Sequence, residues 1–210
     1  KMYKDKRMVV VYTDYDADGI TGGAILWETL HLLGFQAMPY VPHRKHEGYG
    51  FSKIGIDRIK KEFDPGLIIS VDHGISALKQ VSYAKSLGIP IIITDHHHKQ
   101  EEIPEDAAAI FHIPALSGSG TAYYVAKEIY EHFKTKSKNS EKLERFFQTD
   151  YLALAAIGTV ADLVPLLGAS RNLVSAGLAA FPQVKRFGLC ELCRQAEIED
   201  TKITPYEIGF

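Results

Sequence analysis

The sequence predicts an α/β fold: an open, mostly parallel five-stranded sheet flanked by helices and followed by a helical extension. Three observations predict it. Short apolar runs rich in β-branched residues alternate with helical patterns, the runs show little polar alternation, and they stop before residue 116. Strands buried on both faces lack polar alternation, and a strand–helix rhythm is typical of right-handed βαβ crossovers.

Each expected element has its own signal in the sequence. The expected strands are the apolar runs at residues 8–13, 36–41, 67–71, 89–94 and, more weakly, 107–111. Helical spacing and terminal glycines predict helices at 22–34, 53–63 and 76–88, and Ser76 is the predicted N-cap of the last one. Beyond residue 116 we expect helices at 120–134, 143–163 and 169–181, with an exposed polar link at 135–142.

These elements divide the chain near residue 116. Residues 1–116 are expected to form an α/β domain, and residues 117–210 a helical part that completes it and leads to a second domain beyond residue 210. Cys190 and Cys193 are the only cysteines, and their helical flanks favour two residues of a packed helix over half of a zinc site.

Charge and hydropathy narrow the classes of function. With 24 Lys and Arg against 26 Asp and Glu, the net charge is -2, so a nucleic acid would have to be bound through local contacts. No apolar run approaches the roughly 18 residues that span a bilayer, and two cysteines build no disulfide framework. We therefore expect a cytoplasmic protein without a membrane partner.

Acids and imidazoles gather where three of the expected strands end. They are Asp14, Asp16 and Asp18 in TDYDADG, Asp72 and His73 in VDHG, and Asp95, His96, His97 and His98 in TDHHH. Ligands of open α/β sheets bind at the carboxyl ends of the strands, so these side chains are expected to share one crevice. Asp162, in the apolar stretch AAIGTVADLVPL, needs a partner, and this cluster is the obvious one.

Each motif also has a simpler interpretation. D-x-D-x-D-G resembles a calcium loop, but Ile25 stands where that loop needs a glutamate. Asp72 alone could cap a helix, and the histidines alone could belong to a solvated loop. Taken together, several carboxylates repel one another unless a cation neutralises them. Oxygen and imidazole ligands suit Mn²⁺ best, with Mg²⁺ as the alternative, and a pair of ions roughly 3.5 to 4 Å apart is typical of phosphoester hydrolysis.

The motifs DYDADG, VDHG, DHH and GTVADLVP, in this order, resemble those of the DHH phosphoesterase superfamily, and in particular its single-strand-specific DNA exonucleases. The segments VPHRKHEGYGF and LSGSGTAYYVAKEI resemble the same branch. Pyrophosphatases of the superfamily have a histidine where this chain has Tyr12, which argues against that branch.

The resemblance implies a role for each motif residue. Asp16 and Asp72 would hold one ion, and the second would be held by Asp18, Asp72, His96 and Asp162. His97 would face the scissile phosphate, Asp95 would orient the histidines, and Asp14 would be a further catalytic residue. The implied reaction is 5′ to 3′ hydrolysis of single-stranded DNA to mononucleotides, in repair and recombination. His98 is expected to be a loop residue.

Two further segments are candidates for binding phosphate. Arg44 follows the second strand, and a guanidinium group can bind two phosphate oxygens, although an exposed surface arginine is an equal alternative. Ser117, Gly118 and Gly120 open a helix whose free N–H groups could cradle a second phosphate, unless the segment is a plain capped turn. Candidates for base stacking are Tyr49, Phe51, Tyr123 and Tyr124.

Single-stranded DNA is thus the expected partner, with single-strand-binding protein or a helicase as partners of regions outside these residues. Two alternatives stay open. One is a phosphodiesterase of short oligonucleotides or cyclic dinucleotides, and the other is a non-catalytic replication scaffold of the same superfamily. The scaffold is disfavoured because all five expected metal ligands are present in the sequence.

Overall fold

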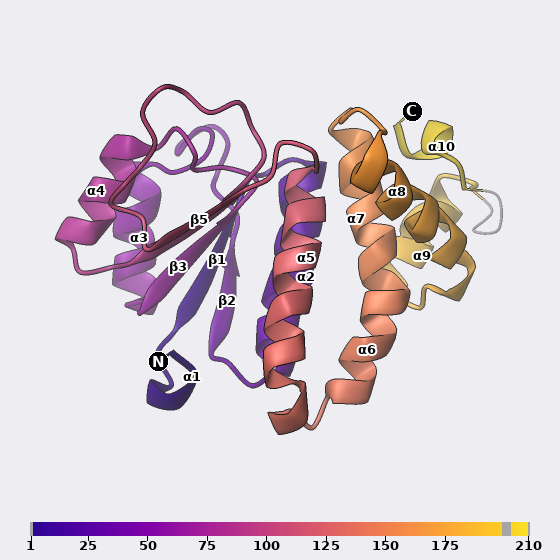
Figure 1. Ribbon diagram of the computed structural model, residues 1–210, viewed down its shortest axis with the longest axis horizontal. Helices are drawn as coiled ribbons and strands as arrows, with labels where there is room; N and C mark the ends of the chain where they lie inside the picture. Colours follow the sequence, from indigo (N-terminus) through magenta and orange to yellow (C-terminus); the bar gives the residue numbers. More distant parts are fainter. Residues whose placement is uncertain (1, 199–202, 210) are drawn as a thin grey trace.

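The computed structural model describes residues 2–198 and 203–209. Up to the last strand, the elements are α1 Met2–Asp5, β1 Val9–Thr13, α2 Ala17–Leu32, β2 Ala37–Tyr40, α3 Lys53–Phe63, β3 Leu67–Val71, α4 Leu78–Ser86, β4 Ile91–Asp95 and β5 Ala109–His112. The rest is helical, with α5 Gly118–Phe133, η1 Lys134–Lys136, α6 Ser140–Gln148, α7 Asp150–Ala161, α8 Gly168–Ala180, η2 Phe181–Gln183, α9 Phe187–Gln195 and α10 Pro205–Gly209. Figure 1 colours them in chain order.

The five strands form one parallel sheet in the order β2-β1-β3-β4-β5. β1 pairs with β2 on one side and with β3 on the other, and Val9 lies opposite both Ala37 and Leu67. The chain reverses its direction across the sheet at this point, which places a topological switch point at the carboxyl ends of β1 and β3. The predicted fold class is confirmed, and every predicted strand lies within two residues of its observed bounds.

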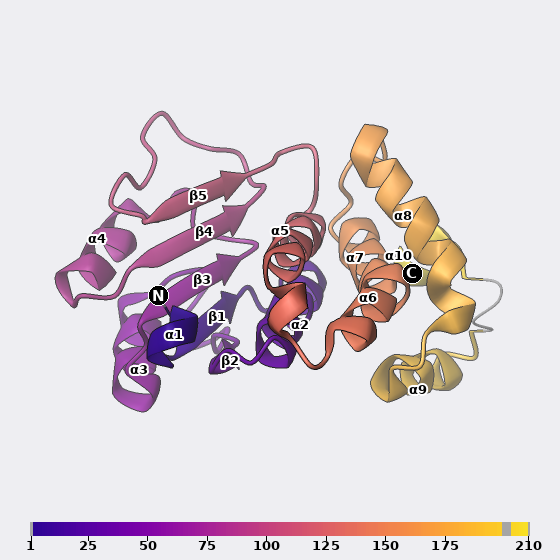
Figure 2. The same cartoon turned by 60° about the horizontal axis from the view of Figure 1, so that its bottom comes forward.

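Helices cover both faces of the sheet (Figure 2). On one face, Val10 of β1 belongs to the same buried cluster as Ile56 of α3 and Val81 of α4. On the other face, Val9 and Val11 belong to a cluster with α2 and α5. Alternate residues of a strand point to opposite faces, so two apolar faces require a run without polar alternation. Beyond α2 and α5, α7 and then α8 form a further layer (Figure 1).

The starts of α2 and α4 differ from the prediction. α2 begins at Ala17, not at residue 22, since the side chain of Asp16 accepts a hydrogen bond from the Gly19 N–H at 2.9 Å and caps the helix. Ser76 does not cap α4, which starts at Leu78 after Ala77 without a side-chain cap. The early start of α2 makes Asp16 the N-cap and places Asp18 in the first turn, whereas Asp14 lies before the helix.

The single helix predicted at 143–163 is wrong. Thr149 has φ −132° and ψ −90°, which separates α6 from α7. Its hydroxyl donates to the Arg145 carbonyl at 2.9 Å, so a local hydrogen bond competes with the helical path. The polar link at 135–142 is also shorter than predicted, because α6 begins at Ser140.

The cysteine pair lies on a helix, as predicted, but this helix is not packed in the core. Cys190 is exposed and Cys193 is half-buried, and α9 has no fully buried residue. Over residues 2–198 and 203–209, no helix combines the length and the apolar character that crossing a bilayer requires.

Candidate metal centre

The predicted site residues converge at the carboxyl edge of the sheet. β1 leads into Asp14 and Asp16, β3 into Asp72, and β4 ends at Asp95 before His96. Asp162 comes from the carboxyl end of α7, across the crevice. Three groups of side chains offer ligand atoms within 4.8 Å of one another: Asp14, Asp16 and Asp72; Asp18, His96 and Asp162; and Asp72, His96 and His97.

His96 lies at the centre of this cluster. Its Nε2 atom is 3.1 Å from Asp72 Oδ1, 3.3 Å from Asp162 Oδ2 and 3.8 Å from Asp18 Oδ2. Neither this nitrogen nor either oxygen of Asp72 has a hydrogen-bond partner, and all three are buried. Buried polar atoms are costly without partners, and a divalent cation is the partner that these donor atoms fit.

The pKa values of three acids in the cluster are raised above their ordinary range. Burial, together with the carboxylates of Asp18 and Asp16, raises the pKa of Asp72 to about 10. Burial raises the pKa of Asp14 to about 6, and both burial and Asp18 raise that of Asp162. Close carboxylates destabilise one another's charged forms, so this pattern is typical of a site that binds positive charge.

Asp72 also has an unusual backbone. Its φ of 69° lies in the left-handed region, which side chains with a Cβ rarely adopt. Gly118, from the start of α5, packs against the Asp72 side chain. A Cβ at this position would lie 2.4 Å from Asp72 Oδ1, so only glycine fits. Strain of this kind persists only where surrounding structure enforces it, and it concentrates at functional sites.

Asp95 holds the histidine segment in place from behind. Its Oδ1 accepts hydrogen bonds from the His96 and His97 backbone N–H groups at 2.7 and 3.1 Å, and lies 2.8 Å from His97 Nδ1. Its Oδ2 accepts from the Ile75 N–H at 2.8 Å. Burial acts to raise the pKa of Asp95, but the hydrogen bonds from His97 and Ile75 outweigh it and lower this pKa to about 2. His98 lies exposed in the following loop, as predicted.

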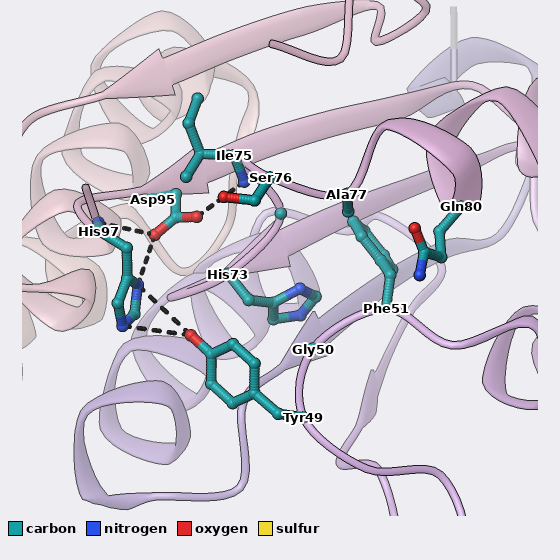
Figure 3. A pocket seen from close by; sticks show the side chains of 11 residues that line it. Tyr49, Gly50, Phe51, His73, Ile75, Ser76, Ala77, Gln80, Asp95 and His97 are labelled. Atoms are coloured by element: carbon teal, nitrogen blue, oxygen red, sulfur yellow. Dashed lines mark hydrogen bonds and ion pairs between the residues drawn. The ribbon is translucent and has the colours of Figure 1, made fainter. Parts of the chain in front are cut away.

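The hydrogen bond to Asp95 raises the pKa of His97 against the opposing effect of burial. The His97 side chain is 42% exposed, so it can meet a substrate in the crevice. The Tyr49 hydroxyl lies 3.2 Å from its Nε2 atom, a contact that the sequence did not indicate (Figure 3).

The predicted phosphate cradle at Ser117, Gly118 and Gly120 is wrong. The Gly118 and Ser119 N–H groups donate to the carboxylate of Asp18, at 2.5 and 2.9 Å, and Gly120 N–H donates to Ser117 Oγ at 3.0 Å. All of these residues are buried. The segment therefore positions Asp18, and its N–H groups are not free for a substrate.

Arg44 lies exposed beside the first motif, with its guanidinium carbon 5.2 Å from the centre of the Tyr15 ring. The loop that carries it is anchored by Glu47, whose side chain is 1% exposed. Glu47 accepts hydrogen bonds from the Tyr40 hydroxyl at 2.5 Å, the His43 N–H at 3.2 Å and Arg58 at 3.0 Å.

Two buried residues close to the site, Glu47 and His73, were not predicted from the sequence to have a role in it. Glu47 stands in the polar run HRKHEG, and such runs are usually solvated, so only its position before Gly-Tyr-Gly could have drawn attention to it. His73 received no role, although it follows Asp72 directly. Its Nε2 donates to the Tyr12 carbonyl at 3.0 Å, and burial lowers its pKa to about 4. The hydroxyl of Tyr12 in turn donates to the Gly50 carbonyl at 3.2 Å.

A parallel α/β sheet with aspartates and histidines from three strand ends, completed by an aspartate from a helix, defines the class of DHH phosphoesterase domains. The chain belongs to this family, because the profile described as DHH family, N-terminal domain, matches residues 8–159.

Particular relatives can be named within the family. The single-stranded-DNA-specific exonuclease RecJ of Bacillus subtilis is 35% identical over 211 residues, which are 96% of this chain and 25% of that protein. A crystal structure of exonuclease RecJ bound to manganese superimposes with a TM-score of 0.83 at 29% identity, covering 100% of this chain and 52% of that one. The RecJ of Thermus thermophilus in complex with Mn²⁺ gives a TM-score of 0.77 at 27% identity, covering 100% of this chain and 29% of that one. The chain thus spans about a quarter of the curated relative from Bacillus subtilis.

Proposed function

We propose that the chain carries the metal-dependent phosphodiesterase centre of a 5′ to 3′ exonuclease that acts on single-stranded DNA and releases mononucleotides. The observation that carries the proposal is the convergence of Asp72 Oδ1 and His96 Nε2, two buried side-chain atoms that lie 3.1 Å apart and have no hydrogen-bond partner. Similarity to RecJ exonucleases supports the substrate and a place in DNA repair and recombination. Those relatives are longer, and partners such as single-strand-binding protein or a helicase would meet their further regions.

Two divalent cations, Mn²⁺ or Mg²⁺, fit the ligand groups. Asp16 and Asp72 would hold one, with Asp14 in the same group of side chains, and Asp18, Asp72, His96 and Asp162 would hold the other. Asp72 would bridge them because it has two buried and unpartnered oxygens. When bound, such ions lower the pKa of water and neutralise charge that develops on a phosphoryl group. RecJ crystal structures with Mn²⁺ support this choice.

The remaining residues orient and protonate the substrate. His97, whose pKa is raised by the hydrogen bond to Asp95, would donate a hydrogen bond or a proton to the scissile phosphate. Arg44, at the rim of the crevice, would bind a backbone or terminal phosphate through its planar group. A net charge of -2 keeps bulk attraction to DNA weak, so these local contacts would carry the binding. The protein would act in the cytoplasm.

A non-catalytic scaffold is a poorer explanation. A scaffold needs no buried cluster of mutually repelling carboxylates, and such a cluster destabilises a fold that does not use it. A phosphodiesterase of short oligonucleotides would use the same centre, and only the substrate length separates it from the exonuclease.

The test is a Mn²⁺ titration of the wild-type protein and the Asp72→Ala variant on single strands labelled at either end. We expect cleavage from the 5′ end by the wild type, no cleavage by the variant, and no cleavage of blunt duplex. Equal cleavage by both proteins would refute the proposal. Faster cleavage of a dinucleotide than of a long strand would favour the short-oligonucleotide enzyme.

A further inference from the structure

A pocket of about 310 Å³ lies directly beside His97, between the loop that follows β2 and the start of α4 (Figure 3). Tyr49 and His97 form one side of the pocket, and Gln80 of α4 lies across from them. Phe51 and Ile75 also line it and are 4% and 2% exposed, so they belong to the packed interior. A ligand in this pocket would contact the same imidazole that we expect to face the phosphate.

Most of the lining offers no charge to a ligand. No lysine or arginine is among the described residues that line the pocket. Of its two imidazoles, His73 has a pKa that burial lowers, and His97 is the one that we expect to face the scissile phosphate. The one acid of the lining, Asp95, already accepts hydrogen bonds from His97 and from the Ile75 N–H. Its carboxylate is therefore occupied and is not available to bind a cationic ligand. The other polar side chains include Ser76 and Gln80, both uncharged.

Two glycines shape the pocket in advance of any ligand. Gly50 has φ +64°, and a Cβ there would lie 3.6 Å from the His73 side chain. Gly74 has φ +117°, and a Cβ there would lie 3.2 Å from Phe51. These backbone conformations suit glycine and bring the two loops close together. His73 lines the pocket with a ring fixed by its bond to the Tyr12 carbonyl, and its Nδ1 is a buried acceptor without a partner.

We propose that this pocket binds the nucleobase of the nucleotide adjoining the scissile phosphate. The proposal rests on the proposed function. A base is flat, uncharged and partly apolar with a hydrogen-bonding edge, which matches an aromatic wall at Tyr49 and an amide at Gln80. The amide offers both a donor and an acceptor, so different bases are accepted. The volume, near the lower end of the roughly 300–1,000 Å³ range of ligand pockets, admits one base and not a run of bases.

The first test compares a normal single strand with strands that lack the base of the first or the second nucleotide from the 5′ end. With Mn²⁺, we expect the wild type to cleave the normal strand with a kcat/KM about 10-fold higher than one of the abasic strands, a typical effect of one stacked base. Gln80→Ala and the pocket-filling Ala77→Phe should reduce this ratio toward one. The matched control is Lys79→Ala, because Lys79 does not line the pocket although it lies next to Gln80 on the same helix.

Two results of this test would refute the proposal that the pocket binds a base. One is a wild type that cleaves all three strands equally well. The other is a set of variants that slow every strand by the same factor and so keep the wild-type ratio. Ala77 also packs against a core cluster, so far-ultraviolet circular dichroism is used to check that the Ala77→Phe variant folds. Gln80→Ala tests the proposal independently of that variant.

A binding measurement separates the pocket from the catalytic proposal. The protein, labelled with ¹⁵N and kept free of metal with EDTA, is titrated with deoxyadenosine monophosphate and with deoxyribose 5-phosphate. We expect only the nucleotide to shift the amide signals of Ser76 and Gln80. Equal shifts from both compounds, or none, would overturn the base pocket even if DNA is cleaved. Base-dependent shifts without any cleavage would support the pocket and refute the exonuclease.

Discussion

Replacing Asp72 with asparagine should stabilise the metal-free protein while it abolishes cleavage. Asp72 is 1% exposed, and neither of its oxygens has a hydrogen-bond partner. The pKa of its carboxyl group rises from 3.8 to about 10 on folding because of burial and the charges of Asp18 and Asp16. Asparagine has nearly the same shape but stays neutral at every pH, so it removes this cost.

The sign and size follow from proton linkage. Between these two pKa values the folded wild type binds a proton that the unfolded chain does not bind, so its free energy of unfolding falls as the pH rises. Each pH unit is equivalent to about 1.4 kcal/mol. From about pH 5 to about pH 7.5, the advantage of Asp72→Asn should therefore grow by as much as about 3 kcal/mol.

Urea unfolding in EDTA, followed by circular dichroism at both pH values, measures this advantage. Asp150→Asn is the matched control, because Asp150 is also buried, at 4% exposed, but its Oδ2 lies 2.9 Å from the Thr149 hydroxyl oxygen, a polar neighbour that the Asp72 oxygens lack. We expect Asp72→Asn, and not the control, to be more stable than the wild type near pH 7.5. We expect Mn²⁺ to stabilise the wild type and the control but not Asp72→Asn, because only that variant lacks a proposed metal ligand. A variant that is no more stable than the wild type near pH 7.5 would refute the reasoning.

Three further predictions concern other parts of the site. Glu47→Gln weakens the hydrogen bonds that anchor the loop after β2, and it should raise KM for single-stranded DNA about 5-fold with little change in kcat. The control is Glu62→Gln at the other, exposed partner of Arg58, and it should change neither KM nor kcat. Gly118→Ala places a Cβ 2.4 Å from Asp72 Oδ1 and should lower the free energy of unfolding in urea by about 1 to 3 kcal/mol. Unchanged stability would contradict this close approach. His97→Asn should lower kcat about 10²-fold while the metal content of the protein, measured by elemental analysis, stays the same. A loss of metal from this variant would show that His97 is a metal ligand.

The sequence alone predicted where the candidate site lies. In a parallel sheet all strands end at one edge, so the residues after each apolar run must meet there. This geometry brought Asp72 and His96 together from local patterns alone, and the cost of burying an isolated acid indicated that Asp162 lies beside them, as it does. The strands were predictable for the same local reason, since burial on both faces leaves a continuous apolar run.

Only the tertiary structure decided which partner each polar group takes. The N–H groups of Gly118 and Ser119 looked free in the sequence, but they bind Asp18, about a hundred positions earlier in the chain. Glu47 stands in a polar run that suggests a solvated side chain, yet the fold buries it, and it accepts a hydrogen bond from the Tyr40 hydroxyl. Local patterns specify helices, strands and strand ends, whereas the acceptor that satisfies a buried donor depends on which distant segments the packing brings within about 3 Å.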